Sequence, residues 1–365
     1  VLRRNGYRTA MVTDNPWMLK PSWKRFRQGF DDFRAVWNQE HQRLRAGSRT
    51  ERIDIAGFVP RALLRRRHEE KRVASYLKVV ERYLRHTRTF EREDDWFAPR
   101  VFRQAMDWVD EHTRRRATQP FALFVECYDP HEPWDPPKKY VDLYDDPDYR
   151  GVEPVQPFYG SDRYLTPRET RRMRALYAAE LTMADRWMGN LLERLEERRL
   201  MDRTVVVFWS DHGMSLAERG WVGKNQSQLY AEIVDSPLVI RHPERRKAGE
   251  TSDYLAQNHD IPATALAMLG FAAPRHSEGH DLSLLFRDED VQEREVQTAG
   301  YNEYVFAADR RWSYIDSNRF KNPKLYDRRK DPREQRDVSS EHYDVVQRMR
   351  RAIREDAGNR TIPRY

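Results

Sequence analysis

The arrangement of apolar and polar residues along the chain predicts short strands that alternate with amphipathic helices. Apolar runs at Arg8–Thr13, Phe121–Glu126 and 205–209 have the length and composition of buried strands of a parallel sheet. Between them, apolar residues spaced by three or four positions are typical of helices that pack on such a sheet. The helical stripes are Val73, Leu77, Val80 and Leu84; Phe102, Met106 and Val109; and Met173, Leu176, Tyr177, Leu181, Ala184, Met188, Leu191 and Leu195. The pattern predicts an α/β fold with a mostly parallel central sheet and helices on both faces.

Local signals indicate where several helices begin and end. Residues 166–169, Thr-Pro-Arg-Glu, form a capping box with proline at the first helical position, so a long helix is predicted to begin there. Gly270 follows the amphipathic stretch 260–269 and predicts the end of that helix. Gly6 in the same way predicts the end of a helical turn before the first strand.

The pattern changes after about residue 285, where short aromatic runs are interrupted by charged residues. These runs lie at 301–306, 312–315 and 325–327. They predict a small antiparallel sheet, and a final helix is predicted at about 341–355. We therefore expect two domains, an α/β catalytic domain over residues 1–285 and a C-terminal α+β subdomain over residues 286–365.

A long segment without helical or strand periodicity follows the second strand. Residues 135–165 are rich in proline, aspartate and tyrosine, which predicts a surface excursion. Loops of this length without structure of their own are usually functional. We therefore expect the excursion, together with Trp134, to shape a substrate pocket.

Polar side chains follow three of the predicted strands. Asp14 follows the first strand, Asp129 and His131 follow the second, and Asp211 and His212 follow the third. Parallel strands open at the same edge of a sheet, and ligands of such sheets bind beyond the carboxyl ends of the strands. The sequence therefore predicts that these side chains converge on one site.

Asp211 and His212 are candidate metal ligands. A carboxylate oxygen and an imidazole nitrogen together suit a divalent cation. The alternative is a strand that stops at a turn, with Asp211 capping the next helix. Two ligands are too few for Ca²⁺, which takes about six to eight oxygens. A cation at this pair would therefore need further ligands from substrate, water or other residues.

His131 and Lys224 are candidates for contact with an anionic substrate. Prolines on both sides hold the loop of His131 extended, and its imidazole could donate to an anionic oxygen or a leaving group. Lys224 lies in the glycine-containing segment 220–225, where the backbone can approach a ligand and an ammonium can neutralise a transferring group. The alternatives are a loop histidine packed beside Trp134 and a solvent-facing lysine.

Composition narrows the remaining possibilities. Cys127 is the only cysteine, so no intramolecular disulfide forms, and its place after a strand suits either a nucleophile or, more commonly, a buried structural thiol. The net charge of +7 raises the possibility of a nucleic-acid partner, but the basic residues are scattered among 59 acidic ones, so we expect none. No apolar run approaches the ~20 residues of a membrane span. The oligomeric state and the compartment, cytoplasmic or periplasmic, stay open.

Five ordered motifs resemble the sulfatase family of the alkaline phosphatase superfamily. They are 5–10 with 29–31, 128–134, 204–243, 259–264 with 269–270, and 325–334. The resemblance implies that Asp211 and His212 bind a divalent metal ion, usually Ca²⁺, and that His131 and Lys224 contact the sulfate or its bridging oxygen. It also implies hydrolysis of a sulfate ester, of a small molecule or a glycan, through a formylglycine made from cysteine or serine.

The chain departs from the pattern of that family in two places. The family's N-terminal acidic pair and its Cys-x-Pro-x-Arg nucleophile motif are absent, and residues 14–17 offer neither the lysine nor the histidine that many members carry there. We therefore expect a truncated form that is inactive by itself. The alternatives are a phosphodiesterase or phosphonate monoester hydrolase of the same superfamily, and a non-catalytic homologue.

Overall fold

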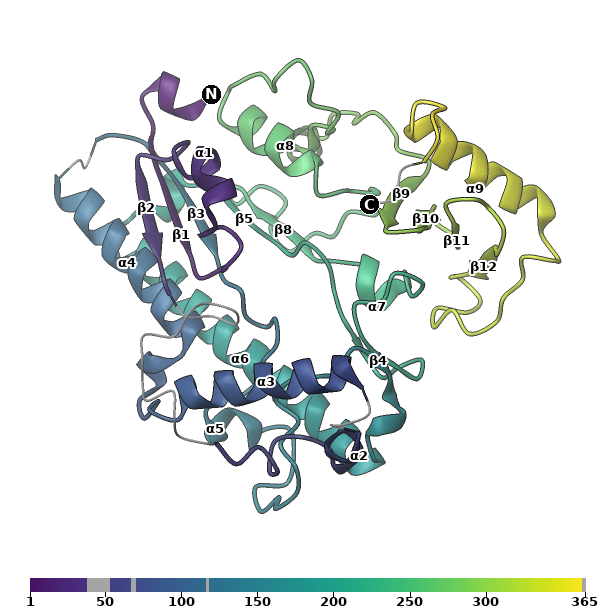
Figure 1. The fold of residues 1–365 in the computed structure, drawn as a ribbon. Helices are drawn as coiled ribbons and strands as arrows, with labels where there is room; N and C mark the ends of the chain where they lie inside the picture. The colour runs from purple at the N-terminus through teal and green to yellow at the C-terminus, as the bar shows by residue number, and fades with distance from the viewer. Residues whose placement is uncertain (38–52, 67–69, 116–117, 363–365) are drawn as a thin grey trace. The chain divides into compact units, whose positions relative to one another are not determined.

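The chain, drawn from its N-terminus to its C-terminus in Figure 1, divides into two compact units. The computed structural model describes residues 1–37, 53–66, 70–115 and 118–362. Unit 1 comprises Val1–Leu200 and Leu216–Val222, and unit 2 comprises Met201–Ser215 and Gly223–Tyr365. In the described ranges, no helix combines the length and the apolar character that crossing a bilayer requires.

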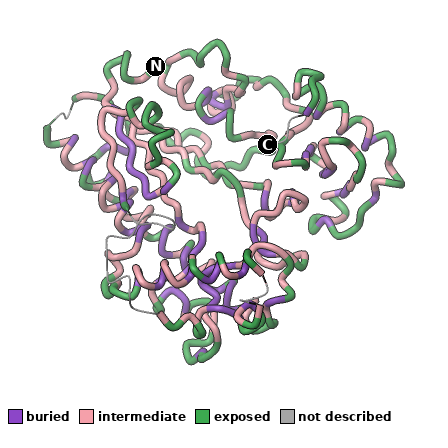
Figure 2. Tube along the Cα trace, viewed as in Figure 1, coloured by how far each residue is buried: buried purple, intermediate pink, exposed green. Residues whose placement is uncertain are grey.

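Unit 1 is built on a parallel sheet of three strands in the order β2-β1-β3. The strands are β1 (Arg8–Thr13), β2 (Asp32–Ala35) and β3 (Phe121–Glu126). β1 lies in the middle and is buried from Thr9 onward, as Figure 2 shows. The predicted strands at 8–13 and 121–126 are thereby confirmed, including their parallel pairing, which brings Thr13 opposite Glu126 at the carboxyl edge.

Three long helices accompany this sheet: α3 (Lys71–Thr87), α4 (Phe97–Arg115) and α6 (Pro167–Glu197). α4 packs against β1, β3 and α6. The predicted capping box is confirmed, since Thr166 Oγ1 accepts from the Glu169 amide and the Glu169 carboxylate accepts from the Thr166 amide. Unit 1 also contains the short helices α1 (Lys24–Arg27), α2 (Arg61–Arg65) and α5 (Lys138–Val141). The predicted α/β architecture is therefore present in this unit.

The segment after β3 differs from the surface excursion that its composition predicts. It contains α5 and the short strand β4 (Gly160–Ser161), and it buries several aromatic and aliphatic side chains. These are Tyr140, Val141, Tyr149, Val155 and Tyr164. Trp134 is fully buried and its indole donates to the Pro130 carbonyl, so it anchors the start of this segment from within the unit, and its part in a substrate pocket stays a prediction. The prolines and aspartates dominate the composition and conceal these anchors.

The predicted strand at 205–209 is observed as β5 (Val206–Trp209), but its predicted setting is wrong. β5 pairs with β8 (Leu238–Arg241) in a two-stranded antiparallel sheet of unit 2. Phe208 is 40% exposed, so the strand is not fully buried. A short run of β-branched and aromatic residues favours a strand without specifying its direction, which explains the error.

Unit 2 also contains an antiparallel sheet in the order β12-β11-β10-β9, as predicted. Its strands are β9 (Gln297–Tyr301), β10 (Tyr304–Ala308), β11 (Trp312–Ser317) and β12 (Lys324–Asp327). Alternate residues of β10 face opposite sides: Val305 joins a core with Met349 of α9 (Tyr343–Asp356), whereas Phe306 joins a core with Ile233. This sheet is therefore covered on both faces.

The remaining α-helices and strands of the described residues are short, and six 3-10 helices accompany them. These α-helices and strands are α7 (Ala231–Val234), α8 (Asp260–Met268), β6 (Ser215–Leu216) and β7 (Trp221–Gly223). α8 is followed by Gly270 at φ 78°, and Gly6 has φ 83° after the first helical turn, so both predicted helix ends are confirmed. The domain boundary at residue 285 stays a prediction.

Candidate functional site

Asp211 and His212 follow β5 and form an exposed pair in unit 2. Their side chains are 80% and 43% exposed, and Asp211 Oδ2 lies 3.5 Å from His212 Nε2. His212 Nδ1 lies 2.9 Å from the Gly213 carbonyl oxygen. Because a carbonyl oxygen can only accept, the neutral imidazole carries its hydrogen on Nδ1. Nε2 then has a free lone pair beside the Asp211 carboxylate. The alternative in which Asp211 caps a helix is wrong, because its Oδ1 accepts from the His212 amide and the next element is a strand.

Gly213 fixes the position of this pair through a close backbone approach. Its amide donates to the Ile233 carbonyl at 2.8 Å. A Cβ at position 213 would lie 2.2 Å from the Glu232 carbonyl oxygen, so no side chain fits there. Asn258 also donates from its amide side chain to the Asp211 carbonyl at 3.1 Å. The turn that carries the pair is therefore anchored by two other segments of the unit.

The donor atoms of this pair fit part of a divalent-cation site. A carboxylate oxygen and a neutral imidazole nitrogen 3.5 Å apart can bind one ion together. The bond from Nδ1 to a backbone carbonyl is the usual way in which a metal-binding histidine is oriented. Among the described residues of unit 2, no further histidine, cysteine or acid completes a group of three with them.

Lys224 lies in unit 2 directly after β7. It is part-buried, and the preceding Gly223 has φ 92°, a conformation that favours glycine. The following turn is held by Asn225, whose side-chain oxygen accepts from the Ser227 amide. The lysine is therefore carried by a defined turn and is not a fully solvent-exposed side chain.

His131 lies in unit 1 in a tight turn, not in the extended loop that its flanking prolines predict. Its amide donates to the Tyr128 carbonyl at 2.8 Å. The imidazole stacks on the Tyr128 ring with centroids 4.1 Å apart, whereas Trp134 packs edge-on against Tyr177. Nδ1 lies 2.9 Å from the Glu132 carbonyl oxygen, and Nε2 lies 3.1 Å from the Tyr128 hydroxyl. In this arrangement Nδ1 donates and Nε2 accepts.

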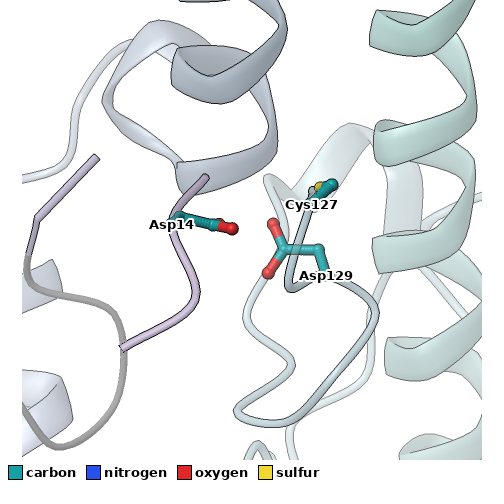
Figure 3. Close-up of side chains that lie close together, drawn as sticks. All are labelled: Asp14, Cys127 and Asp129. Atoms are coloured by element: carbon teal, nitrogen blue, oxygen red, sulfur yellow. The ribbon is translucent and has the colours of Figure 1, made fainter. Parts of the chain in front are cut away.

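A cluster of buried acids lies at the carboxyl ends of β1 and β3 in unit 1. Figure 3 shows the side chains of Asp14, Cys127 and Asp129 pointing toward one another, and their ligand atoms lie within 4.8 Å of each other. Asp14 is fully buried, and burial together with the charge of Asp129 raises its pKa well above the usual value. Burial also raises the pKa of the Cys127 thiol well above its usual value. A thiol in this form is a poor nucleophile, which favours the structural interpretation of Cys127.

Two further acids extend this cluster. Glu180 of α6 is 2% exposed and hydrogen-bonds to Asp129, and burial raises its pKa well above the usual value. Burial raises the pKa of Asp135 to about 7, although hydrogen bonds from Tyr83 and Thr87 oppose the shift. The end of the sheet in unit 1 therefore concentrates acids that burial holds toward their protonated forms.

The predicted convergence of strand ends is confirmed for Asp14 and Asp129. Cys127 lies two residues before Asp129, so its proximity follows from theirs, whereas Glu180, in the middle of the long predicted helix, was not predicted to join them. A charged residue within the apolar stripe of that helix was the available signal, because Glu180 lies four residues after Leu176 and four before Ala184 and so shares their buried face. Whether Asp211, His212 and Lys224 join the same site stays a prediction.

Comparison with known proteins identifies the class to which this fold and these residues belong. The family described as Sulfatase matches residues 1–271, and the family described as N-sulphoglucosamine sulphohydrolase, C-terminal, matches residues 217–358. The chain belongs to the sulfatase family, whose members generally use a divalent metal ion.

Curated relatives carry related names. The chain is 34% identical over 128 residues to an N-acetylglucosamine-6-O-sulfatase of Bacteroides thetaiotaomicron, covering 35% of this chain and 23% of that protein. It is 26% identical over 261 residues to an arylsulfatase of Clostridium perfringens, covering 64% and 53%. It is 28% identical over 198 residues to the multifunctional alkaline phosphatase superfamily protein PehA of Trinickia caryophylli, covering 47% and 38%. The chain thus spans about half or less of the length of these relatives.

Solved structures share the fold. The phosphonate monoester hydrolase of Agrobacterium radiobacter matches with a TM-score of 0.71 and 17% identity, covering 98% of this chain and 79% of that one. At this identity the likeness concerns the fold.

Proposed function

We propose that this chain provides the cation-binding and substrate-binding residues of a sulfatase that hydrolyses a sulfate ester of a small molecule or a glycan. The family match over residues 1–271 is the observation that carries the proposal. The names of the relatives, an N-acetylglucosamine-6-O-sulfatase and an arylsulfatase, support this substrate class. In this proposal residues 1–285 form the catalytic domain and residues 286–365 the C-terminal subdomain.

Each candidate residue has a distinct task in the proposed reaction. Asp211 and His212 bind the divalent cation, Ca²⁺, through a carboxylate oxygen and Nε2. When bound, the cation withdraws negative charge from the sulfate oxygens. The Lys224 ammonium neutralises the same group, and the His131 imidazole, when protonated, donates from Nε2 to the bridging oxygen of the leaving alcohol. Tyr128, whose hydroxyl meets Nε2 at 3.1 Å, keeps that nitrogen oriented in the absence of substrate.

Calcium binding by the purified chain tests the assigned ligands. Because the pair supplies only two protein ligands, we expect calorimetry to show weak Ca²⁺ binding by the wild-type chain, with water as the remaining ligands. Asp211→Asn and His212→Ala should each weaken this binding by more than about tenfold. Asp253→Asn serves as the matched control, because its side chain is 85% exposed and lies in the same unit. Equal affinities in all four proteins would overturn the assignment of Asp211 and His212.

Paired activity measurements test the substrate class. Residues 1–365 contain neither a Cys-x-Pro-x-Arg nor a Ser-x-Pro-x-Arg motif, so we expect no turnover from this chain alone. The open reading frame with its in-frame upstream codons is therefore assayed on an aryl sulfate and an aryl phosphonate ester. Faster turnover of the sulfate supports the proposal. Faster turnover of the phosphonate would support the second candidate, a phosphonate monoester hydrolase, a class of enzyme whose solved structure shares the fold of this chain. An extended frame without either motif would indicate a non-catalytic homologue.

A further inference from the structure

The three side chains at the carboxyl ends of β1 and β3 have the composition of a metal site that the proposed reaction does not use. Asp14 and Asp129 supply carboxylate oxygens, and Cys127 supplies sulfur, with all ligand atoms within 4.8 Å of one another. Figure 3 shows the two carboxylates facing each other across the space between the strand ends. Groups of acidic side chains are common in proteins without a metal ion, so a metal site also requires a ligand atom that nothing else in the protein satisfies.

Asp14 provides that indication. Its side chain is 0% exposed. Oδ1 accepts from the Tyr128 amide at 2.8 Å, whereas Oδ2 is buried and has no hydrogen-bond partner. A buried carboxylate oxygen without a partner is costly unless a proton or a cation satisfies it. Arg100 interacts with Asp14 electrostatically, but no hydrogen bond joins the two within the described residues.

We propose that Asp14, Cys127 and Asp129 bind a divalent cation of the zinc class, with water as the fourth ligand. Thiolate and carboxylate are both established ligands of Zn²⁺, and three protein ligands with one water is a familiar tetrahedral arrangement. The mixed donor set argues against Ca²⁺ and Mg²⁺, which require about six or more oxygen ligands. The proposal concerns a site in unit 1 and does not depend on the cation assigned to Asp211 and His212.

The geometry requires only small adjustments. Bond lengths of about 2.3 Å to sulfur and about 2.1 Å to oxygen place tetrahedral ligand atoms about 3.4–3.6 Å apart. The present separations, up to 4.8 Å, close to those values through side-chain movements of about an ångström.

Surrounding groups complete the site. Asp129 accepts from the Ala98 amide at 3.0 Å and hydrogen-bonds to Glu180, so its carboxylate is held in place from behind. Two positive charges on the ion and three negative ligands leave a net charge of −1, which the guanidinium of Arg100 offsets. Binding deprotonates the thiol and any protonated carboxyl group and releases those protons to the buffer.

Cobalt spectroscopy on the purified 365-residue chain tests the site, with Co²⁺ as the probe. Because Cys127 is the only cysteine, a thiolate-to-cobalt charge-transfer band can arise from one residue alone. We expect this band to saturate at one equivalent of Co²⁺ and to disappear when Zn²⁺ is added. Cys127→Ser should abolish the band, and Asp14→Asn should weaken Co²⁺ binding by more than about tenfold. Asp202→Asn, an exposed position in unit 2, is the matched control and should leave both unchanged.

Two results would overturn the proposal. One is the absence of a charge-transfer band from the wild-type chain at equimolar Co²⁺. The other is a band whose affinity is the same in Asp14→Asn and Asp129→Asn as in the wild type, which would indicate an ion held by the thiolate alone. If Cys127→Ser fails to fold, the wild-type spectrum and the two nearly isosteric asparagine variants still decide the outcome. Loss of Ca²⁺ binding in the Asp211 variant does not bear on this test.

Discussion

Two fully buried aspartates, one in each unit, differ in how their charge is satisfied. Asp260 of unit 2 accepts two hydrogen bonds from the Arg294 guanidinium, at 2.6 and 2.8 Å, and two more from backbone amides. Although burial alone would raise it, these contacts hold the pKa of Asp260 below its usual value. Asp14 of unit 1 has one backbone donor, an unpartnered oxygen and acidic neighbours, and its pKa is raised. Burial raises the pKa of both carboxyl groups, so the donors around each one decide whether that effect is overcome.

The largest expected effect comes from removing the partner of Asp260. Arg294→Met leaves a buried carboxylate without its counter-ion, which should lower the free energy of unfolding by about 3–5 kcal/mol. Urea unfolding at neutral pH measures the change. Arg246→Met, which breaks an exposed pair with Glu244, is the control and should change stability by less than about 0.5 kcal/mol. A loss of similar size in both variants would show that the buried pair has no special role.

The buried acids of the two units should also make the free energy of unfolding depend on pH in opposite ways. In unit 1 the acid whose pKa has a defined value is Asp135, which belongs to the same cluster as Asp14. Asp135 has a pKa of about 7 in the folded chain against 3.8 as the usual value, so the folded state binds more protons between those limits. Stability should therefore fall as pH rises from about 4 to about 7, by at most about 1.4 kcal/mol per pH unit for this group. The depressed pKa of Asp260 works in the other direction, because its contribution is lost as pH falls below the usual value of 3.8.

Asp135→Asn isolates the first of these effects. Asparagine keeps a side-chain oxygen to accept from Tyr83 and Thr87 but has no proton to lose, so the decline toward pH 7 should become flatter. Chelator-treated protein is used, so that bound metal ions do not alter the titration. Identical slopes for the wild type and the variant would contradict the raised pKa.

Asp14→Asn should change the free energy of unfolding less than Arg294→Met does, and in the opposite direction if at all. In metal-free protein at neutral pH this change removes a carboxyl group that burial disfavours as an anion and adds a donor next to Asp129. We expect stability to stay within about 1 kcal/mol of the wild type or to increase. A loss as large as that of Arg294→Met would mean that Asp14 is satisfied in the native chain by a group not yet recognised.

The smallest expected change in stability is at Asp211, whose carboxylate is exposed. With its side chain 80% exposed, Asp211→Asn should change the free energy of unfolding by less than about 0.5 kcal/mol. Thermal unfolding in chelator measures this value. A larger change would show that the turn after β5 depends on this carboxylate for its structure as well as for the proposed cation site.

The elements of the fold were predictable where local signals decide them. The apolar runs of β1 and β3, the capping box at Thr166 and the glycine after α8 all act over a few residues, and each prediction is confirmed. The antiparallel pairing of β5 was not predictable, because the direction of a partner strand depends on residues some 30 positions away.

The candidate site was predictable only in part for the same reason. The rule for parallel strand ends brought Asp14 and Asp129 together although 115 positions separate them, as their contact in the structure confirms. No such rule places Glu180, which reaches the cluster from one turn of α6 through helix packing. The turn at His131 was also missed, since flanking prolines restrict the backbone without fixing its direction.

The single cysteine has a further consequence for experiments on this protein. Cys127 lies where β3 leaves the sheet, close to the buried Asp14 and Asp129, and it is the only cysteine, so a thiol-specific reagent can label the chain at one atom only. The labelling rate in mild denaturant then reports how often that strand end opens, without any engineered residue. Each chain thus carries an intrinsic kinetic probe of local unfolding at its acidic strand ends.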